Sequence, residues 1–307
     1  MFGYTVRRIL SFIPLLWAVT TVTFFLMHSV PGGPFDRDDS KPLPEKTIAA
    51  LEQKYNIDGS LWDQYTGYLQ DLVKGDLGLS FQRNIPVTDL LRQRYPTTLQ
   101  LGLSAFAFAL AIGLTLGVLA AVYQNSWIDY VSVTVATVGV AVPSFVMAVF
   151  LILVFSVKLG WFDVLGWEMW NYKKTVLPTI SLGLLPAAYI SRVARASMLE
   201  TLRQDYVRTA RAKGLVERHV IIRHAARNGM IPVLTVMGPI LAGLITGSFI
   251  IESAFAIPGI GKLFVQAVFV RDYGMIMGTT LLYAFAIAVL NLVVDLSYAL
   301  VDPRIRY

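Results

Sequence analysis

The chain has 307 residues, of which 55% are hydrophobic and 15% are charged, and its formal net charge is +6. Soluble domains average roughly 45–50% apolar and about 25% charged residues, so this composition excludes a disordered or collagen-like chain and argues against a soluble enzyme. The sequence has no cysteine, which excludes disulfides, thiolate metal sites and cysteine nucleophiles.

Six stretches of the sequence contain no Asp, Glu, Lys or Arg, and they predict six transmembrane helices: 9–35, 95–128, 130–157, 175–191, 228–251 and 273–294. A helix needs roughly 20 apolar residues to cross a bilayer, and only the fourth stretch falls short of that length. It also contains Pro178 and Pro186, and we expect it to span if Arg192 and Arg195 extend to the interface. The first apolar run is too long for a signal peptide, so we expect a permanent anchor.

The distribution of basic residues predicts which side of the membrane each loop faces. The loop 191–230 contains nine basic residues and only three acidic ones. Loops rich in Lys and Arg stay in the cytoplasm. With six spans both termini lie on one side, so we expect the two termini and this loop to be cytoplasmic.

The segment 31–96, between the first two spans, is then extracytoplasmic. Apolar residues at helical spacing predict helices over Pro44–Tyr55, Leu61–Val73 and Pro86–Tyr95. The simpler interpretation is a cap of amphipathic helices that rests on the membrane. The alternative is a surface that receives an extracytoplasmic partner and helps to gate a pore.

The cytoplasmic loop is predicted to form two short helices. Ser197–Lys213 has an amphipathic pattern and is followed by Gly214, a residue typical of helix ends. A second helix is expected over about Val216–Arg227, before Pro232 opens the fifth span. The basic surface could bind anionic lipid or a cytoplasmic protein, whereas nucleic acid is disfavoured for a loop tethered between two spans. A short, rigid helix pair favours the protein partner.

Small residues recur every four positions in the second span and predict close helix packing. They are Ala105, Ala109, Gly113, Gly117 and Ala121, and the fifth span repeats the pattern with Gly243 and Gly247. The sequence leaves open whether the helix that packs against them belongs to this chain. In the third span, Pro143 predicts a kink.

Residues that could drive transport or catalysis are scarce in the spans. They contain almost no ionisable side chains, on which ion-coupled carriers usually depend. The sequence also lacks a phosphate-binding loop and a His-Glu-x-x-His motif. Energy for transport would therefore come from a source other than a coupled ion gradient, while a passive channel and a membrane-embedded enzyme remain as alternatives.

Motifs along the whole chain carry a resemblance to a known family. The most specific is Asp205–Gly214; the others, in chain order, are Arg7-Arg8, Pro31–Phe35, Gly75–Gly78, His224-Ala225, Glu252, Pro258–Gly261, Arg271–Tyr273 and Asp302–Arg306. In these motifs the chain resembles the inner-membrane permease subunits of binding-protein-dependent ABC importers. It looks most like the B-type subunit of oligopeptide and dipeptide permeases.

The resemblance and the spans together imply an all-α membrane protein with six transmembrane helices. An outer helical segment follows the first span, and a coupling loop, 192–230, joins spans four and five. The chain would consist of an N-terminal anchor with its extracytoplasmic segment, 1–94, and a five-helix core, 95–307. It would lie in the plasma membrane of a prokaryote.

The resemblance also implies which residues couple the permease to an ATPase. They are Asp205, Tyr206, Arg208, Thr209, Ala210, Arg211, Ala212, Lys213, Gly214 and His224. The general pattern of such permeases, Glu-Ala-Ala-x-x-x-Gly, is only partly present. Arg208 and Thr209 stand at its first two positions, so we expect no Glu-based contact, while Ala210 and Gly214 match it.

The partners implied by the resemblance are a second, homologous permease in a heterodimer, two cytoplasmic ATPase subunits, an extracytoplasmic binding protein and membrane lipid. ATP and Mg would be bound by the ATPase subunits, so this chain would have no ATPase site and no cofactor of its own. The implied substrates are peptides, most of all oligopeptides. Nickel chelates, glutathione and other small solutes are the alternatives.

Overall fold

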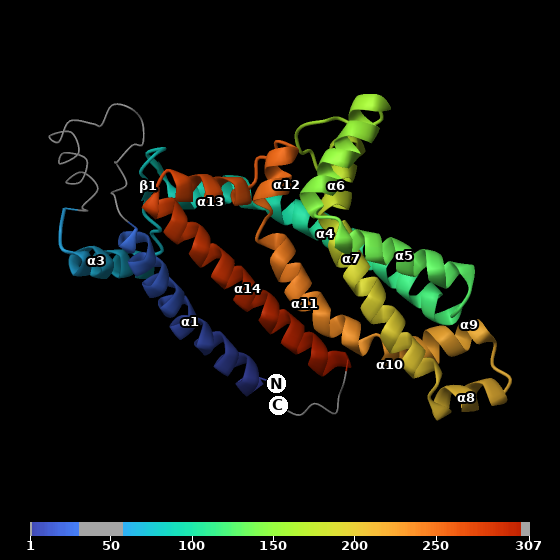
Figure 1. Cartoon of the computed structure of the whole chain (residues 1–307). Helices are drawn as coiled ribbons and strands as arrows, with labels where there is room; N and C mark the ends of the chain where they lie inside the picture. Colours follow the sequence, from blue (N-terminus) through green and yellow to red (C-terminus); the bar gives the residue numbers. More distant parts are fainter. Residues whose placement is uncertain (1, 31–57, 302–307) are drawn as a thin grey trace. The chain divides into compact units, whose positions relative to one another are not determined.

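The computed structural model describes residues 2–30 and 58–301, and these are almost entirely helical (Figure 1). They form two compact units. Among the described residues, the first unit contains 2–30, 58–96 and 259–292, and the second contains 97–258 and 293–301. The helix expected over Pro44–Tyr55 lies outside the described residues.

The first unit contains α1 (Phe2–Ser29), α3 (Leu61–Val73), β1 (Leu79–Ser80), β2 (Ile85–Pro86), the start of α4 (Val87–Val122), α13 (Ile260–Phe269) and most of α14 (Tyr273–Val301). The bounds of α3 match the prediction. Ser60 and Asp63 explain its start, because each side chain accepts a hydrogen bond from the other residue's backbone N–H. The Tyr65 hydroxyl shares a 2.7 Å hydrogen bond with that of Thr21 and so attaches α3 to α1.

A short hairpin in this unit is held by one acidic side chain. Strands β1 and β2 pair antiparallel, with Ser80 opposite Ile85. The carboxylate of Asp272 accepts hydrogen bonds from the Ser80 hydroxyl and from the Phe81 backbone N–H. Because Asp272 directly precedes α14, it ties the hairpin to the start of that helix.

The prediction of a separate helix over Pro86–Tyr95 is wrong. Residues Val87–Val122 form one helix, α4, with Pro96 inside it. A proline removes one backbone hydrogen bond but does not have to end a helix in a membrane protein, where neighbouring groups can satisfy the freed carbonyl. The last predicted outer helix and the second span are therefore continuous.

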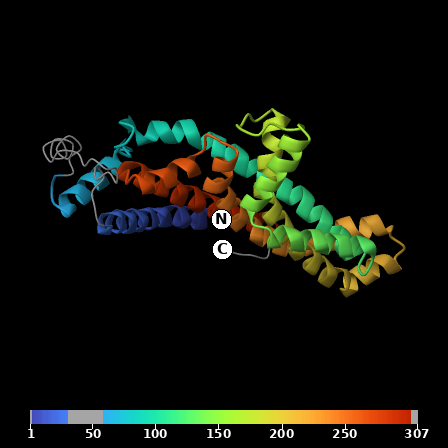
Figure 2. The same ribbon diagram turned by 45° about the horizontal axis from the view of Figure 1, so that its top comes forward.

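The second unit is organised around α7 (Tyr172–Leu202). Helices α5 (Trp127–Ala141), α6 (Ser144–Leu151) and α11 (Ile231–Ile245) all contact it. The remaining elements are most of α4, the end of α14, η1 (Ile152–Lys158), α8 (Asp205–Ala212), α9 (Glu217–His219), η2 (Val220–Ala225), α10 (Ala226–Gly229) and α12 (Phe249–Ala254), where η1 and η2 are π-helical. Figure 2 shows α5 running beside α7 from a second angle.

The small residues of the second span lie against α7 of the same chain. Ala105, Ala109 and Ala121 are buried, and no larger side chain than glycine fits at Gly113 or Gly117. A Cβ atom at Gly117 would lie 2.5 Å from the backbone oxygen of Ser191. The two backbones therefore approach too closely for any side chain between them.

The glycines of the fifth span are placed differently. Gly243 is exposed, and a Cβ atom there would have no neighbour within 4 Å in this chain. Gly247 has a φ of +86° and lies just after α11, where a left-handed conformation lets the chain leave the helix. The helix of this span covers only Ile231–Ile245, less than the predicted stretch 228–251, and α12 follows it.

Two predicted spans are bent. The helices on either side of Pro143 meet at 104°, so the expected kink is confirmed as a complete break. Val142 is extended and Pro143 caps α6, because a residue before proline avoids the helical region. The segment Glu217–Gly229 meets α11 at 56°.

Among the described residues, α1, α4, α7 and α14 are long and apolar enough to span a membrane, and each bent pair could supply one further span.

Candidate functional site

A helical hairpin follows the end of α7, made of α8 on one side and the continuous helix α9–η2–α10 on the other (Figure 1). The sequence predicted a single helix over Ser197–Lys213, and this is wrong. Helix α7 ends at Leu202, and α8 begins at Asp205 after an extended Gln204. The acidic Asp205 suits the first turn of a new helix because it complements the partial positive charge there.

The break lets α8 turn its apolar residues inward. Val207 is completely buried and Ala210 nearly so, in a cluster with Met198 of α7 and with Val220 and Ala225 of the second arm. Ala210 is thus part of the core beneath the hairpin. Its side chain is covered within this chain, so it is not part of the exposed surface of the hairpin.

The other predicted residues of α8 are solvent-exposed. They are Asp205, Tyr206, Arg208, Thr209, Arg211 and Ala212, followed by the equally exposed Lys213 and Gly214. Arg208 forms a long ion pair of 3.6 Å with Asp205 one turn earlier, and both groups are largely in solvent. His224 belongs to the second arm, where it is partly buried and its ring lies 6.0 Å from that of His219.

Two contacts fix the two arms of the hairpin to each other. At the tip, the guanidinium of Arg211 donates to the carboxylate of Glu217, with a shortest distance of 2.7 Å. This hydrogen bonding raises the pKa of Arg211 above its usual range, partly offset by desolvation. At the base, the Asn228 side-chain amide donates to the Tyr206 hydroxyl over 3.0 Å. The hairpin is therefore tied at both ends.

The tip itself depends on Gly214. Its φ is +78°, and its backbone N–H donates to the Arg211 carbonyl, which ends α8. This is the left-handed position after a helix that glycine adopts without strain. No atom lies within 4 Å of the place where a Cβ would be, so the constraint is conformational and not steric.

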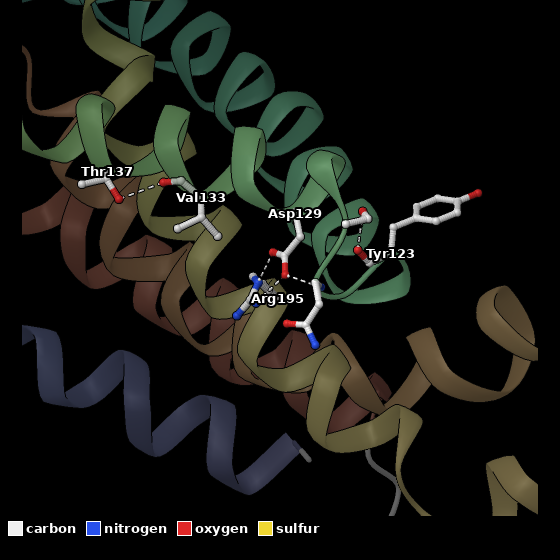
Figure 3. A network of polar contacts seen from close by, with 7 residues as sticks. Tyr123, Asp129, Val133, Thr137 and Arg195 are labelled. Atoms are coloured by element: carbon white, nitrogen blue, oxygen red, sulfur yellow. Dashed lines mark hydrogen bonds and ion pairs between the residues drawn. The ribbon is translucent and has the colours of Figure 1, made fainter.

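An ion pair with a buried carboxylate links the C-terminal part of α7 to α5 (Figure 3). Arg195 of α7 donates to both oxygens of Asp129 in the first turn of α5, over 2.7 and 2.8 Å. The Asn125 backbone N–H donates to the same carboxylate over 3.0 Å. Asp129 is 3% exposed, so its charge is stabilised by these donors and not by water.

This pair adds a partner that the sequence interpretation of Arg195 did not include. The interfacial position expected for its side chain stays a prediction, and the structure shows that the guanidinium is turned towards Asp129. Asp129 was not among the residues predicted to be functional. The available signal was its position, because it is the one ionisable residue between two long uncharged stretches.

A second polar contact is buried in the same unit. The Thr98 hydroxyl of α4 donates to Glu252 of α12 over 2.8 Å, and both side chains are completely buried. Glu252 is thus a core residue that joins two helices. The sequence drew attention to it only as part of a motif.

The first unit contains a cavity of about 390 Å³ between the ends of α1, α3 and α14. Its lining includes His28, Asp63, Tyr68, Asp76 and Tyr273. Burial, and secondarily the charge of Asp76, raises the pKa of Tyr68 well above its usual range, so its hydroxyl stays protonated. Within residues 2–30 and 58–301, no three His, Asp or Glu side chains are grouped so that they could hold a metal ion.

Comparison with known families gives matches over nearly the whole chain. The family described as "Binding-protein-dependent transport system inner membrane component" matches residues 113–307. The N-terminal family of the same membrane components matches residues 1–102.

Several curated relatives are similar over their full length. The oligopeptide transport system permease protein OppB of Haemophilus influenzae is 41% identical over 308 residues, covering 100% of both chains. The dipeptide transport system permease protein DppB of Bacillus subtilis is 40% identical, covering 100% of this chain and 98% of the relative. The glutathione transport system permease protein GsiC of Shigella flexneri is 39% identical over 100% of both chains.

Among solved structures, an inward-facing MetNI methionine ABC transporter contains a chain that matches with a TM-score of 0.59. The match has 18% sequence identity and covers 70% of this chain and 97% of the other. An amino acid ABC transporter with histidines gives a TM-score of 0.53 at 16% identity, covering 68% of this chain and 93% of the other. At these identities the likeness shows a shared fold.

Proposed function

This chain belongs to the family of inner membrane components of binding-protein-dependent transport systems, and we propose that it forms half of the pathway by which an ATP-driven importer moves peptides. It is a multi-pass permease subunit of the inner membrane and has no ATPase site of its own. The observation that carries the peptide assignment is the full-length identity of 41% and 40% to an oligopeptide and a dipeptide permease.

The hairpin of α8 and α9–η2–α10 is the proposed point of attachment for a cytoplasmic ATPase subunit. Support comes from its position directly after the long helix α7, from its exposed basic surface, and from the two contacts that hold its arms together. A helix pair that transmits movement from the ATPase to the spans must move as one rigid body. Movement of the ATPase subunits would reach the spans through α7 and through the segment that leads into α11.

The remaining partners and the topology complete this proposal. The family implies ATPase and substrate-binding partners; a second, homologous permease would supply the other half of the pathway. ATP and Mg would be held by the ATPase subunits. Six spans, counting each bent pair once, would put both termini and the hairpin in the cytoplasm, in agreement with the nine basic residues of loop 191–230.

We also propose a separate function for each of the two parts, 1–94 and 95–307, into which the sequence divides the chain. The N-terminal part, with α3 and the hairpin β1–β2, would meet the extracytoplasmic binding protein, and the 95–307 part would conduct and couple. The cavity of the first unit, formed by α1, α3 and α14, would lie on the outer side of the membrane in this topology.

The substrate assignment is tested by competition for uptake. Cells that carry the intact transporter, and cells from which only this chain is deleted, are compared for uptake of a labelled tripeptide. We expect uptake to depend on the chain and to be inhibited by unlabelled di- to pentapeptides. Uptake that glutathione or a nickel chelate inhibits, and that no peptide inhibits, would contradict the peptide assignment and favour that solute.

A further inference from the structure

An open groove lies along the second arm of the hairpin. Its volume is about 680 Å³, and it is lined by Val216, Arg218, His219, Ile222, Arg223 and Arg227. All six residues are exposed to solvent, and Ile222 is 61% exposed although it is a large apolar side chain. The groove therefore combines three guanidinium groups with an apolar surface.

The π-helical turn η2 explains why these residues share one groove. In an α-helix of 3.6 residues per turn, side chains four apart drift around the axis by roughly 40° at each step. A π-helix bonds five residues back and so has wider turns, which offset this drift. Since η2 covers Val220–Ala225, residues of α9, η2 and α10 such as His219, Arg223 and Arg227 remain aligned along one side.

The groove has an excess of positive charge that the hairpin does not neutralise. In the part of the chain that the structure describes, Arg218, Arg223 and Arg227 make no ion pair, whereas the neighbouring Arg208 and Arg211 pair with Asp205 and Glu217. Three like charges beside one groove repel each other, and carboxylates placed between them would relieve that repulsion. Guanidinium groups bind carboxylates with two parallel hydrogen bonds.

We propose that this groove binds an acidic segment of the cytoplasmic ATPase subunit, one that presents two or more carboxylates beside an apolar side chain. The inference rests on the proposed function, because it assigns the partner's chemistry at the same hairpin. Continuity supports a protein occupant: the groove shares its helix with the residues that clamp α8, Glu217 at one end and Asn228 at the other. Carboxylates would meet the arginines, and the apolar side chain would cover Ile222.

The test uses the transporter purified as a complex and reconstituted into nanodiscs. ATPase subunits from the native complex are stripped and rebound to the membrane part at several salt concentrations. The triple variant Arg218→Gln, Arg223→Gln, Arg227→Gln is compared with a matched variant, Arg192→Gln, Arg203→Gln, whose residues are exposed but lie outside the groove.

We expect the groove variant to bind the ATPase subunits about tenfold or more weakly at low salt, since each exposed charge pair contributes up to a few-fold. Its affinity should also depend less on salt than that of the wild type. The matched variant should behave like the wild type, and Arg→Lys at the three groove positions should restore part of the affinity. Unchanged melting of the membrane part excludes misfolding as the cause.

Two results would overturn the proposal. One is wild-type affinity and salt dependence in the groove variant. The other is a difference between variant and wild type that disappears when anionic phosphatidylglycerol is left out of the nanodiscs, because the groove would then bind lipid. If either result is found but Gly214 variants still uncouple ATP hydrolysis from transport, only the assignment of the groove fails. If the ATPase subunits bind neither the wild type nor any variant of the chain, the proposed function itself fails.

Discussion

Arg211 and Glu217 face each other across the turn at Gly214, and the guanidinium Nη2 and Nε reach the two carboxylate oxygens over 2.7 and 3.1 Å. The pair closes the hairpin at its tip, six residues apart in sequence. Both side chains are about half exposed, at 41% and 53%. An exposed pair contributes little to global stability, so its value lies in fixing the two arms to each other.

Replacing Arg211 by alanine tests this local role. We expect the melting temperature of the purified chain to change little and the backbone amides of 205–229 to exchange with deuterium up to about fivefold faster, the equivalent of about 1 kcal/mol. Hydrogen exchange followed by mass spectrometry measures this. Arg208→Ala is the control, because its partner Asp205 lies on the same helix. Exchange that stays at the wild-type rate in the Arg211 variant would show that the pair does not fix the tip.

Two substitutions of Gly214 distinguish the effect of its backbone conformation from the effect of side-chain size. A valine at its left-handed φ costs roughly 1–2 kcal/mol, whereas asparagine tolerates that conformation. The open space around Gly214 accepts either side chain. We expect Gly214→Val to fold, to hydrolyse ATP in the assembled transporter and to lose most peptide uptake, while Gly214→Asn keeps both. Coupled uptake at the normal rate in the valine variant would refute the role of the tip.

The buried pair of Asp129 and Arg195 predicts a large stability effect. Arg195→Met leaves Asp129 buried without its main donor, and breaking such a pair costs roughly 3–5 kcal/mol. We therefore expect a clear drop in the melting temperature in detergent. Arg192→Met is the matched control, because Arg192 is exposed on the same helix. Equal melting of the two variants would show that the pair does not stabilise the α5–α7 contact.

Two glycine-to-alanine changes test the small-residue contact. At Gly117 the added Cβ would lie 2.7 Å from that of Ala194, so α4 and α7 must separate, and overpacking of this kind costs about 1–3 kcal/mol. At Gly243 the same methyl group meets nothing in this chain. We expect Gly117→Ala to melt at a lower temperature and Gly243→Ala to melt like the wild type. The reverse order would contradict the packing of α4 on α7.

The sequence predicts the helical membrane class and most helices because their signals are local. Uncharged runs mark α1, α4, α7 and α14, and apolar residues at helical spacing mark α3. The break at Pro143 is likewise predicted by a single residue, because any proline keeps the residue before it out of the helical region.

The errors concern features that depend on contacts distant in sequence. The turn at Gln204 forms because Val207 and Ala210 gain burial against Met198 and the second arm, which no local pattern reveals. The pairing of Asp129 with Arg195 joins residues 66 positions apart. At the candidate site, Gly214 is predictable because its role is conformational, whereas the groove beside η2 is not, since π-helical turns have no simple sequence signal.

Contact between the hairpin and a cytoplasmic ATPase subunit can be tested directly, because the sequence has no cysteine. Ala212→Cys would place the chain's only thiol on the exposed face of α8, and Trp170→Cys would place it just before the other end of α7. Each variant is labelled with a photoreactive thiol reagent in native membranes, and its cross-linked partners are identified by mass spectrometry. We predict that Ala212→Cys captures an ATPase subunit and that Trp170→Cys does not. Capture of no ATPase from Ala212→Cys, or equal capture from both positions, would contradict the account.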